Sequence, residues 1–332
     1  MANLLKKTAW KLIEAGDRRD PAINLAIEEY AVRHLDPAYS YFFIYINAPA
    51  VVVGRHQNVL REVNLRRCWD EAIPILRRLS GGGTVAHDRG NLNFTFITVH
   101  TSTTFNRYRQ FLQPIVDVLT ALGAPVRIDE RNDLRLEGKK ISGNAQFTSR
   151  GRLLSHGTLL FDADLNRIKR LVHPDERRSI RDKAPPSVRS AMINVRPYLK
   201  RDISLDGLRR RIIEAVLGQS VERYEFNAED WAAIEKLAEQ KYRRFAWNIA
   251  QSPPCTVKVT APDDRAFSFS YALIEGRFKN FSPSDARLRF WTQWLENRPL
   301  AQETFREMER RIEALPDDSL RKMSERVYKI LI

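Results

Sequence analysis

Hydrophobic positions in the first part of the chain predict a sheet accompanied by helices. A first strand is expected over residues 8–14. Asp20-Pro21 then precedes apolar residues at helical spacing, and proline suits the first turn of a helix, where its missing N–H needs no partner. The continuous apolar run at residues 41–46 predicts a buried central strand, and residues 51–53 predict a short second one.

The middle of the chain predicts further helices and strands, separated by turn residues. Helices are expected at 63–72, 105–122, 205–216 and from Asn227 to about 242, and strands at 132–136, 140–146 and 153–161. Residues 173–191 are rich in proline and charge and have no periodicity. They predict an exposed loop that is long enough to be functional.

The hydrophobic pattern changes after the segment Gln251-Ser252-Pro253-Pro254, which is typical of a linker. Beyond it, strands are expected at 256–260, 266–274 and 277–281, and helices at 285–296, 301–314 and 317–331. Domain boundaries commonly fall in exposed proline-rich segments of this kind. We therefore predict a large domain of residues 1–250 and a small one of residues 255–332.

A run of three glycines stands between two predicted strands. The apolar stretch Ile73–Leu79 leads into Ser80-Gly81-Gly82-Gly83, and alternation at Leu92, Phe94 and Phe96 follows. Glycine allows positive φ and a close approach of backbone N–H groups to a ligand. With Arg78 and His87 nearby, the loop suits an anion such as phosphate or carboxylate. It is neither a Walker A loop nor a dinucleotide fingerprint, and by itself it also fits a glycine-rich hairpin.

Two further positions could carry chemistry near a phosphate. A strand lysine such as Lys140 can neutralise a phosphate and a carboxylate together, although this segment alone is explained more simply by a solvated turn lysine. Asp133 could hold Mg²⁺, which accepts few carboxylates together with phosphate oxygens. Turn chemistry explains Asn132-Asp133 at least as well.

Composition limits the class of protein and the nature of its partners. The 332 residues carry a formal net charge of +14, which attracts acidic partners, but no nucleic-acid-binding motif accompanies the arginines. No stretch approaches the roughly 18 apolar residues of a membrane helix, and no secretory signal is apparent. Cys68 and Cys255 form no disulfide framework or zinc cluster, so a reducing, cytoplasmic setting is expected. An organellar protein without its targeting segment also fits.

Several short stretches follow one another along the chain in a recognisable order. They are Asn24-Leu25-Ala26-Ile27-Glu28-Glu29, Gly54-Arg55-His56-Gln57-Asn58, Arg78-Leu79-Ser80-Gly81-Gly82-Gly83, His87-Asp88-Arg89-Gly90-Asn91, Arg131-Asn132-Asp133-Leu134, Lys140-Ile141-Ser142-Gly143-Asn144-Ala145 and His156-Gly157-Thr158-Leu159-Leu160. Together they resemble the lipoate–protein ligase family, and the resemblance covers nearly the whole chain. Residues after 250 resemble the family's small accessory domain more loosely.

The resemblance implies an α+β fold. Its large domain would hold a mixed or antiparallel sheet with packed helices, as in biotin and lipoyl protein ligases and in class II aminoacyl-tRNA synthetases. A small α/β C-terminal accessory domain would follow. The resemblance also implies a reaction, in which lipoate and ATP, with Mg²⁺, give lipoyl-adenylate. The lipoyl group would then pass to a lysine of an acidic lipoyl domain or glycine-cleavage carrier protein.

The same resemblance assigns site residues. Lys140 corresponds to the catalytic lysine at the activated carboxyl group, and Asp133 remains the candidate metal ligand. The expected substrate and adenylate contacts are Arg78, Ser80, Gly81, Gly82, Gly83, His87, Asn91, Asn132, Ser142, Gly143, His156, Gly157 and Thr158.

Two other classes of function remain compatible with the sequence. A transferase that uses preformed lipoyl-adenylate or an acyl-protein, without ATP activation, would carry nearly the same motifs. A basic nucleic-acid-binding protein on a vestigial ligase fold would bind RNA or DNA with steep salt dependence. We expect neither nucleic acid nor membrane as a partner. The sequence leaves the choice between lipoate and octanoate open.

Overall fold

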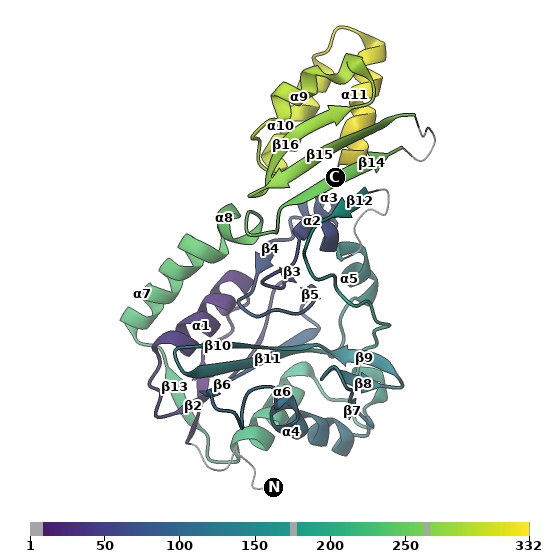
Figure 1. Ribbon diagram of the computed structural model, residues 1–332. Coiled ribbons are helices and arrows are strands. Elements are labelled where there is room, and N and C mark those ends of the chain that lie inside the picture. The colour runs from purple at the N-terminus through teal and green to yellow at the C-terminus, as the bar shows by residue number, and fades with distance from the viewer. Residues whose placement is uncertain (1–8, 173–177, 262–263, 265, 332) are drawn as a thin grey trace.

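A six-stranded mixed sheet forms the centre of the computed structural model, which describes residues 9–172, 178–261, 264 and 266–331 (Figure 1). Its strand order is β10-β11-β6-β2-β1-β13, antiparallel from β10 to β2 and parallel from β2 to β13. The strands are β1 (Trp10–Glu14), β2 (Ser40–Ile46), β6 (Asn91–Val99), β10 (Asn144–Ser149), β11 (Arg152–Leu160) and β13 (Glu222–Glu225). The predicted first strand, the central position of β2 and the mixed sheet are therefore confirmed.

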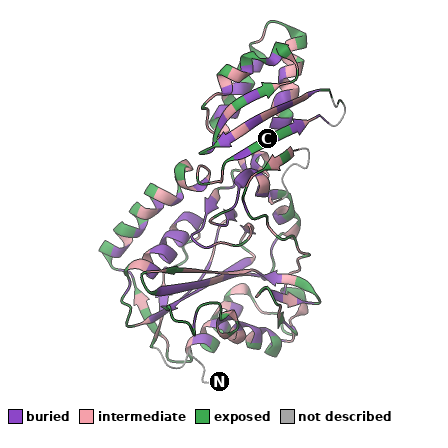
Figure 2. Ribbon diagram, viewed as in Figure 1, coloured by how far each residue is buried: buried purple, intermediate pink, exposed green. Residues whose placement is uncertain are grey.

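Side chains of β2 divide between two hydrophobic cores because successive residues of a strand face opposite sides. Phe42 and Ile44 pack with helices α4 (Tyr108–Ala121) and α6 (Leu205–Leu217). Tyr41, Phe43 and Tyr45 pack with α1 (Pro21–His34) and α7 (Ala228–Leu237) on the other face. Figure 2 shows buried residues along the sheet and exposed ones on the outer sides of the helices.

Helix boundaries follow the capping residues more closely than the hydrophobic pattern. The helix predicted after Asp20-Pro21 is α1, and Asp20 caps it, its Oδ1 accepting from the backbone N of Ala22 at 2.8 Å. The single helix predicted for 63–72 is wrong, because the extended residues Val63 and Asn64 separate α2 (Val59–Glu62) from α3 (Leu65–Asp70). The helix α4 starts at 108 rather than at the predicted 105.

The remaining helices of this region are short. Asp164 caps α5 (Leu165–Leu171), its Oδ1 accepting from the backbone N of Arg167 at 2.9 Å. A single 3-10 turn, η2 (Arg196–Tyr198), precedes α6, and α7 continues as a π-helical turn, η3 (Ala238–Tyr242), before α8 (Phe245–Asn248). Among the described residues, no helix has the length and apolar character required to cross a membrane.

Two small sheets lie beside the central one. The first has the order β4-β3-β5, from β3 (Ala50–Val53), β4 (Ile75–Arg77) and β5 (Val85–His87). The second has the order β7-β8-β9, from β7 (Arg127–Ile128), β8 (Leu134–Leu136) and β9 (Lys139–Ser142). The chain passes from β9 into β10 of the central sheet at Gly143. The prediction of one continuous strand over 140–146 is therefore wrong.

The C-terminal part forms an antiparallel sheet, β12-β14-β15-β16, with helices on one side (Figure 1). Its elements after the linker are β14 (Cys255–Thr260), β15 (Ser268–Ile274), β16 (Arg277–Pro283), η4 (Ala286–Leu288), α9 (Phe290–Leu295), α10 (Gln302–Glu313) and α11 (Asp318–Leu331). The edge strand β12 (Arg178–Arg181) comes from the stretch predicted as a loop, so that prediction is wrong for 178–181. Residues 173–177 of the same prediction lie outside the described part.

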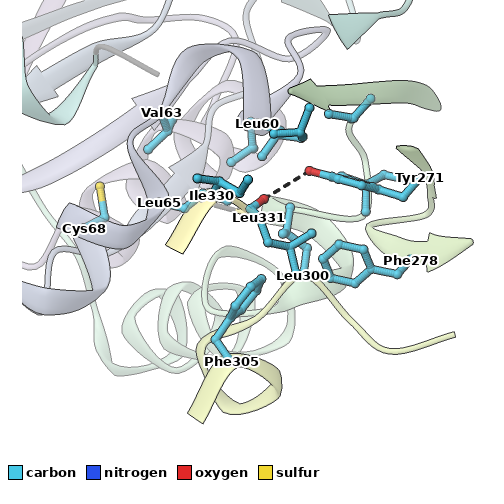
Figure 3. Close-up of a cluster of buried hydrophobic side chains, with 14 of the residues drawn as sticks. Leu60, Val63, Leu65, Cys68, Tyr271, Phe278, Leu300, Phe305, Ile330 and Leu331 are labelled. Atoms are coloured by element: carbon cyan, nitrogen blue, oxygen red, sulfur yellow. Dashed lines mark hydrogen bonds between the residues drawn. The ribbon is translucent and has the colours of Figure 1, made fainter. Parts of the chain in front are cut away.

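A hydrophobic cluster joins the C-terminal helices to α2 and α3 (Figure 3). Leu60 and Leu65 face Leu300 and Ile330 across this contact, and the Trp69 and Phe305 ring centroids are 5.3 Å apart. Cys68 lies in the same cluster, and burial raises its pKa to about 12. The division into domains 1–250 and 255–332 stays a prediction.

Arg77, at the end of β4, is fully buried and bonds to backbone carbonyls and a hydroxyl. Its Nη1 donates to the carbonyls of Gly54 at 3.0 Å and Gln57 at 2.8 Å. Its Nη2 donates to the Asn248 carbonyl at 3.1 Å and to Ser252 Oγ at 2.9 Å. One guanidinium thus joins the turn after β3 to the segment that leads into the C-terminal sheet.

Replacing Arg77 with alanine is expected to destabilise the protein strongly. The substitution leaves several buried carbonyls without a donor, and each such group costs free energy. We expect the free energy of unfolding to fall by roughly 3 kcal/mol or more. Urea denaturation measures it, with Arg67→Ala as the control, because the Arg67 side chain is 44% exposed and pairs with Glu71, four residues along the chain. Equal stability of the two variants would contradict this role.

Candidate active site

A cavity of about 400 Å³ lies between the glycine loop, β9, β10 and β11. Its mouth is lined by partly or fully exposed residues that include Arg131, Arg135 and Lys140. Its inner end is lined by the buried residues Leu25, Glu28, Tyr45, Val52, Arg78, His87 and Asn93. The cavity is therefore a pocket with a basic mouth and a closed, mixed polar and apolar end, which suits an elongated anion.

Arg78 sets the shape of the glycine loop. Its Nη2 donates to the carbonyls of Gly81 at 2.6 Å and Gly83 at 2.8 Å, and its Nε donates to Ser80 Oγ at 3.0 Å. Burial lowers its pKa to about 10, so the guanidinium stays charged at neutral pH. The N–H of a trans peptide points opposite to its carbonyl, so the N–H groups of Gly82 and Thr84 point away from Arg78.

Only particular glycines of the loop are required by the geometry. Gly82 has φ +84°, a left-handed conformation that a β-branched residue adopts only with strain. A Cβ on Gly54, in the turn after β3, would lie 2.0 Å from the Gly82 carbonyl oxygen, so glycine at 54 permits the close approach. Gly81 has open space around it.

A chain of hydrogen bonds crosses the inner half of the cavity. Glu28, on α1, accepts from Tyr45 Oη at 3.1 Å and from the Thr95 hydroxyl, and lies 3.0 Å from His156 Nδ1. His156 Nε2 lies 2.7 Å from Ser80 Oγ. Burial raises the pKa of Glu28, but attraction and hydrogen bonding from His156 outweigh it and the pKa is lowered overall. The network fixes the positions of both the imidazole and the loop serine.

His87 reaches the same end of the cavity from β5. Its Nδ1 lies 2.9 Å from Asn47 Nδ2, whereas its buried Nε2 has no hydrogen-bond partner. Burial, and to a lesser extent Arg78, lowers the pKa of His87 to about 3. The ring is therefore neutral at physiological pH.

An ion pair occupies the mouth of the cavity. Lys140 Nζ lies 2.9 Å from Asp133 Oδ2, and these side chains are 26% and 12% exposed. A Cβ on Gly143 would lie 3.0 Å from Lys140 Nζ, so glycine leaves room for the lysine side chain. Arg135 lies beyond Asp133, at 3.9 Å. The mouth therefore has more positive than negative charge within reach of a ligand.

Residues 182–190, named here the strap, follow β12, and residues 185–190 of it line the cavity. Ser187 Oγ accepts from Gln57 Nε2 at 2.8 Å and from the backbone N of Thr84 at 3.0 Å. Asp182 pairs with Arg61 at 2.9 Å. The strap thus connects the C-terminal sheet to the glycine loop. The sequence indicated only a loop that could be functional, because its partners are distant in the chain.

A second cavity of about 210 Å³ adjoins the first and shares Lys140, Gly143 and Thr158 with it. It adds Asn91 and Ser142, together with apolar residues of β11 and α5. Within the described ranges, no group of three or more histidine, cysteine, aspartate or glutamate residues could hold a metal ion by itself.

The structure gathers most of the predicted site residues around these cavities. The main cavity is lined by Arg78, Gly82, Gly83, His87, Asp133, Lys140, Gly143, His156, Gly157 and Thr158, and the second adds Asn91 and Ser142. Ser80, Gly81 and Asn132 are not among the residues that line either cavity. Ser80 and Gly81 bond to Arg78, and the Asn132 carbonyl accepts from Asn144 Nδ2 at 2.7 Å.

Sequence reasoning missed Glu28, Tyr45, Asn93, Arg135 and the strap as site elements. The sequence contains an indication of the role of Glu28, because two adjacent carboxylates, Glu28 and Glu29, interrupt the apolar positions of a helix predicted to be buried. A charge on such a face needs partners inside the protein. Tyr45 and Asn93 had no such signal, since each belongs to an apolar strand.

Gly82→Val is expected to lower the affinity for lipoyl-adenylate, the ligand that the resemblance implies, by roughly tenfold or more. The backbone at residue 82 has φ +84°, which valine adopts only with strain, and the strain would displace the carbonyls that accept from Arg78. Gly81→Ala is the matched control and is expected to change affinity little. Calorimetric titration with a non-hydrolysable acyl-adenylate analogue measures both variants. Equal affinities would remove the loop from the binding site.

Comparison with known proteins agrees with this arrangement. The family model for the lipoyl protein ligase A/B catalytic domain matches residues 20–217. Lipoate-protein ligase LplJ of Bacillus subtilis is 37% identical over 238 residues, covering 70% of this chain and 72% of that protein.

Solved structures show the same fold. A lipoate protein ligase of Thermoplasma acidophilum with bound lipoic acid matches with a TM-score of 0.62 and 22% identity, over 73% of this chain and 99% of that one. The bipartite ligase of that organism, solved in a study with its E2 lipoyl domain, also matches with a TM-score of 0.62. The identity is 23%, over 73% of this chain and 96% of that one. A lipoate-protein ligase A bound with ATP matches with a TM-score of 0.60 and 23% identity, over 73% of this chain and 98% of that one. The family model and the Bacillus relative show that this chain belongs to the lipoate–protein ligase family.

Proposed function

We propose that this protein activates lipoate with ATP and transfers the lipoyl group to a lysine of an acceptor protein. The observation that carries the proposal is the cavity with Lys140 at its basic mouth and buried residues at its inner end. A fatty acid with one carboxylate fits such a pocket with its charge at the mouth. Relatives named lipoate–protein ligases, and neighbours solved with lipoic acid or ATP, support it.

Activation joins the carboxylate to the nucleotide. A carboxylate oxygen attacks the α-phosphorus of ATP, the bond to the β-phosphate oxygen breaks, and pyrophosphate leaves. Negative charge accumulates on the phosphate oxygens during this displacement, so a fixed cation beside them lowers the barrier. Lys140 is the residue we assign to this role, and Gly143 leaves room for its side chain.

Asp133 and phosphate oxygens would hold Mg²⁺, which needs only one or two protein carboxylates when it also binds phosphate. The metal would neutralise charge on the leaving pyrophosphate. Asp133 suits this role because it is the carboxylate among the residues that line the cavity mouth, although it pairs with Lys140 in this structure. A ligand that draws Lys140 toward its phosphate would free the Asp133 carboxylate.

Transfer follows from the mixed anhydride. The neutral amine of the acceptor lysine attacks the lipoyl carbonyl carbon, the bond to the phosphate oxygen breaks, and AMP leaves as the nitrogen loses a proton to solvent. We propose a lipoyl domain or a glycine-cleavage carrier protein as the acceptor. The net charge of +14 would speed encounter with an acidic acceptor. We also propose a cytoplasmic location, in keeping with the two unpaired thiols.

Lys140→Ala is expected to lower lipoyl transfer by roughly a hundredfold or more while leaving the fold intact, because a fixed cation at the reacting phosphate is lost. Lys139→Ala is the matched control, since Lys139 is the preceding residue of the same strand and is exposed. Mass spectrometry of a lipoyl domain after incubation with lipoate, ATP and Mg²⁺ measures transfer. A folded Lys140→Ala protein with near-normal turnover would refute the assignment.

Lipoate-dependent release of pyrophosphate from ATP and Mg²⁺ is expected before any acceptor is added. Asp133→Ala should slow this release about tenfold, and it should slow transfer from supplied lipoyl-adenylate less, because only activation needs the metal. A coupled pyrophosphate assay measures the first step. Efficient transfer of supplied adenylate without any pyrophosphate release would favour the alternative, a lipoyl or octanoyl transferase that lacks ATP activation.

A further inference from the structure

Strand β10 forms one edge of the central sheet and begins at the main cavity. Among the described strands it pairs with β11 alone. Its first two residues, Asn144 and Ala145, line the cavity together with Lys140. The strand continues for six residues in all, a length of roughly 20 Å, to the hairpin turn at Arg150-Gly151. The sheet therefore has an edge that leads directly to the cavity.

The turn of this hairpin shows which backbone groups of β10 point away from the sheet. Arg150 has φ +50° and Gly151 has φ +73°, as in the type I′ turn of a two-residue hairpin. The two residues that flank such a turn exchange both hydrogen bonds, and bonded and non-bonded pairs then alternate along the strands. Thr148 and Gln146 therefore stand at non-bonded positions, with their N–H and C=O groups pointing outward.

Hydrogen bonding on the other side of β11 gives the same assignment. His100 N donates to the Gly151 carbonyl at 2.8 Å, so these residues continue the β11–β6 ladder as a bonded pair. By alternation Leu153, the partner of Thr148, turns its backbone groups toward β6 and away from β10. No backbone hydrogen bond from another described segment reaches Gln146 or Thr148. Their outward N–H and C=O groups are thus available to a partner strand.

This edge lacks the features that keep open sheet edges from pairing. Such edges are commonly protected by charged side chains, proline, bulges or short length. The strand β10 contains no charged residue and no proline, and its register against β11 runs without a bulge. The opposite edge of the same sheet, β13, has four residues, of which three are charged. The sheet is thus protected at the far edge and open at the edge that begins at the cavity.

The hairpin that carries this edge is basic. Residues 138–161 include two lysines and two arginines but no aspartate or glutamate. Arg150 is exposed at the hairpin tip, and Arg33 Nη1 lies 3.3 Å from Ser149 Oγ. A strand placed beside β10 meets positive charge along its length. This charge favours an acidic partner and disfavours a second copy of the same basic hairpin.

We propose that the acceptor protein docks by β-strand addition, in which the segment that carries its target lysine pairs with β10. The inference rests on the proposed function, which requires this lysine to reach the lipoyl carbonyl beside Lys140. Pairing along β10 places one end of the added strand next to Asn144, at the cavity. Main-chain hydrogen bonds give such complexes their affinity, so one edge can serve acceptor segments that differ in side chains.

Thr148→Pro tests the pairing, because proline removes the outward N–H, which the ladder to β11 does not use. We expect the KM for a lipoyl domain, measured with supplied lipoyl-adenylate, to rise about tenfold. Lipoate-dependent pyrophosphate release should stay unchanged, which shows that the variant is folded. Thr148→Ala is the matched control, since it loses the same side chain but keeps the N–H, and its KM should equal that of the parent. Equal KM values for the two variants would overturn the proposal.

Amide hydrogen exchange of the unsubstituted protein, followed by NMR, tests the pairing without any substitution. A saturating lipoyl domain should slow exchange at Gln146 and Thr148 by roughly tenfold or more, and leave Arg223 on the opposite edge unchanged. Unchanged exchange along β10 would overturn the proposal. Equal slowing at raised protein concentration without the lipoyl domain would also overturn it, because the edge would then pair with a second copy of this chain.

The two tests separate this proposal from the proposed function. If the parent protein transfers the lipoyl group while exchange along β10 stays unchanged, only the docking mode is rejected. If the parent transfers nothing to a lipoyl domain from either ATP and lipoate or supplied adenylate, the proposed function is rejected and the docking mode with it.

Discussion

The buried guanidinium of Arg77 is the interaction on which the arrangement of this protein depends. It bonds the turn after β3, which contains Gly54, to the backbone around Asn248 that leads into the C-terminal sheet. Because Gly54 in turn touches the Gly82 carbonyl, the position of the glycine loop depends on the same contact. A positive charge satisfied by carbonyl dipoles needs every carbonyl at its place, so this point of the fold tolerates little displacement.

Two neighbouring arginines, the last residue of β4 and the residue after it, perform different tasks. Arg77 points into the junction between sheets, whereas Arg78 points into the loop and fixes its carbonyls. Both guanidinium groups donate to backbone carbonyls, and burial lowers the pKa of each to about 10. The positive charge that a ligand can contact therefore lies at the cavity mouth, where Lys140 and Arg135 are both close to Asp133.

The C-terminal sheet is connected to the cavity through the strap. Strand β12 completes that sheet, and the next residues carry Ser187 to the glycine loop, where it bonds to Thr84 and Gln57. The position of the C-terminal part and the closure of the cavity mouth are therefore physically linked. The hydrophobic cluster around Leu60, Leu300 and Phe305 supports this connection from the other side (Figure 3).

The sequence by itself determined the elements whose signal is local. The apolar run of β2, the helix that begins at Pro21 and the strand–glycine loop–strand order all follow from side-chain periodicity and backbone chemistry. The motifs around Gly82, Lys140 and His156 indicated the family and most of the cavity lining. Tertiary structure decided what depends on distant partners. Short-range patterns cannot show that Gly143 joins two sheets, that residues 178–181 complete a C-terminal sheet, or that Asn24 and Asn47 lie in one hydrogen-bond chain with His87, because each is set by residues far apart in the chain.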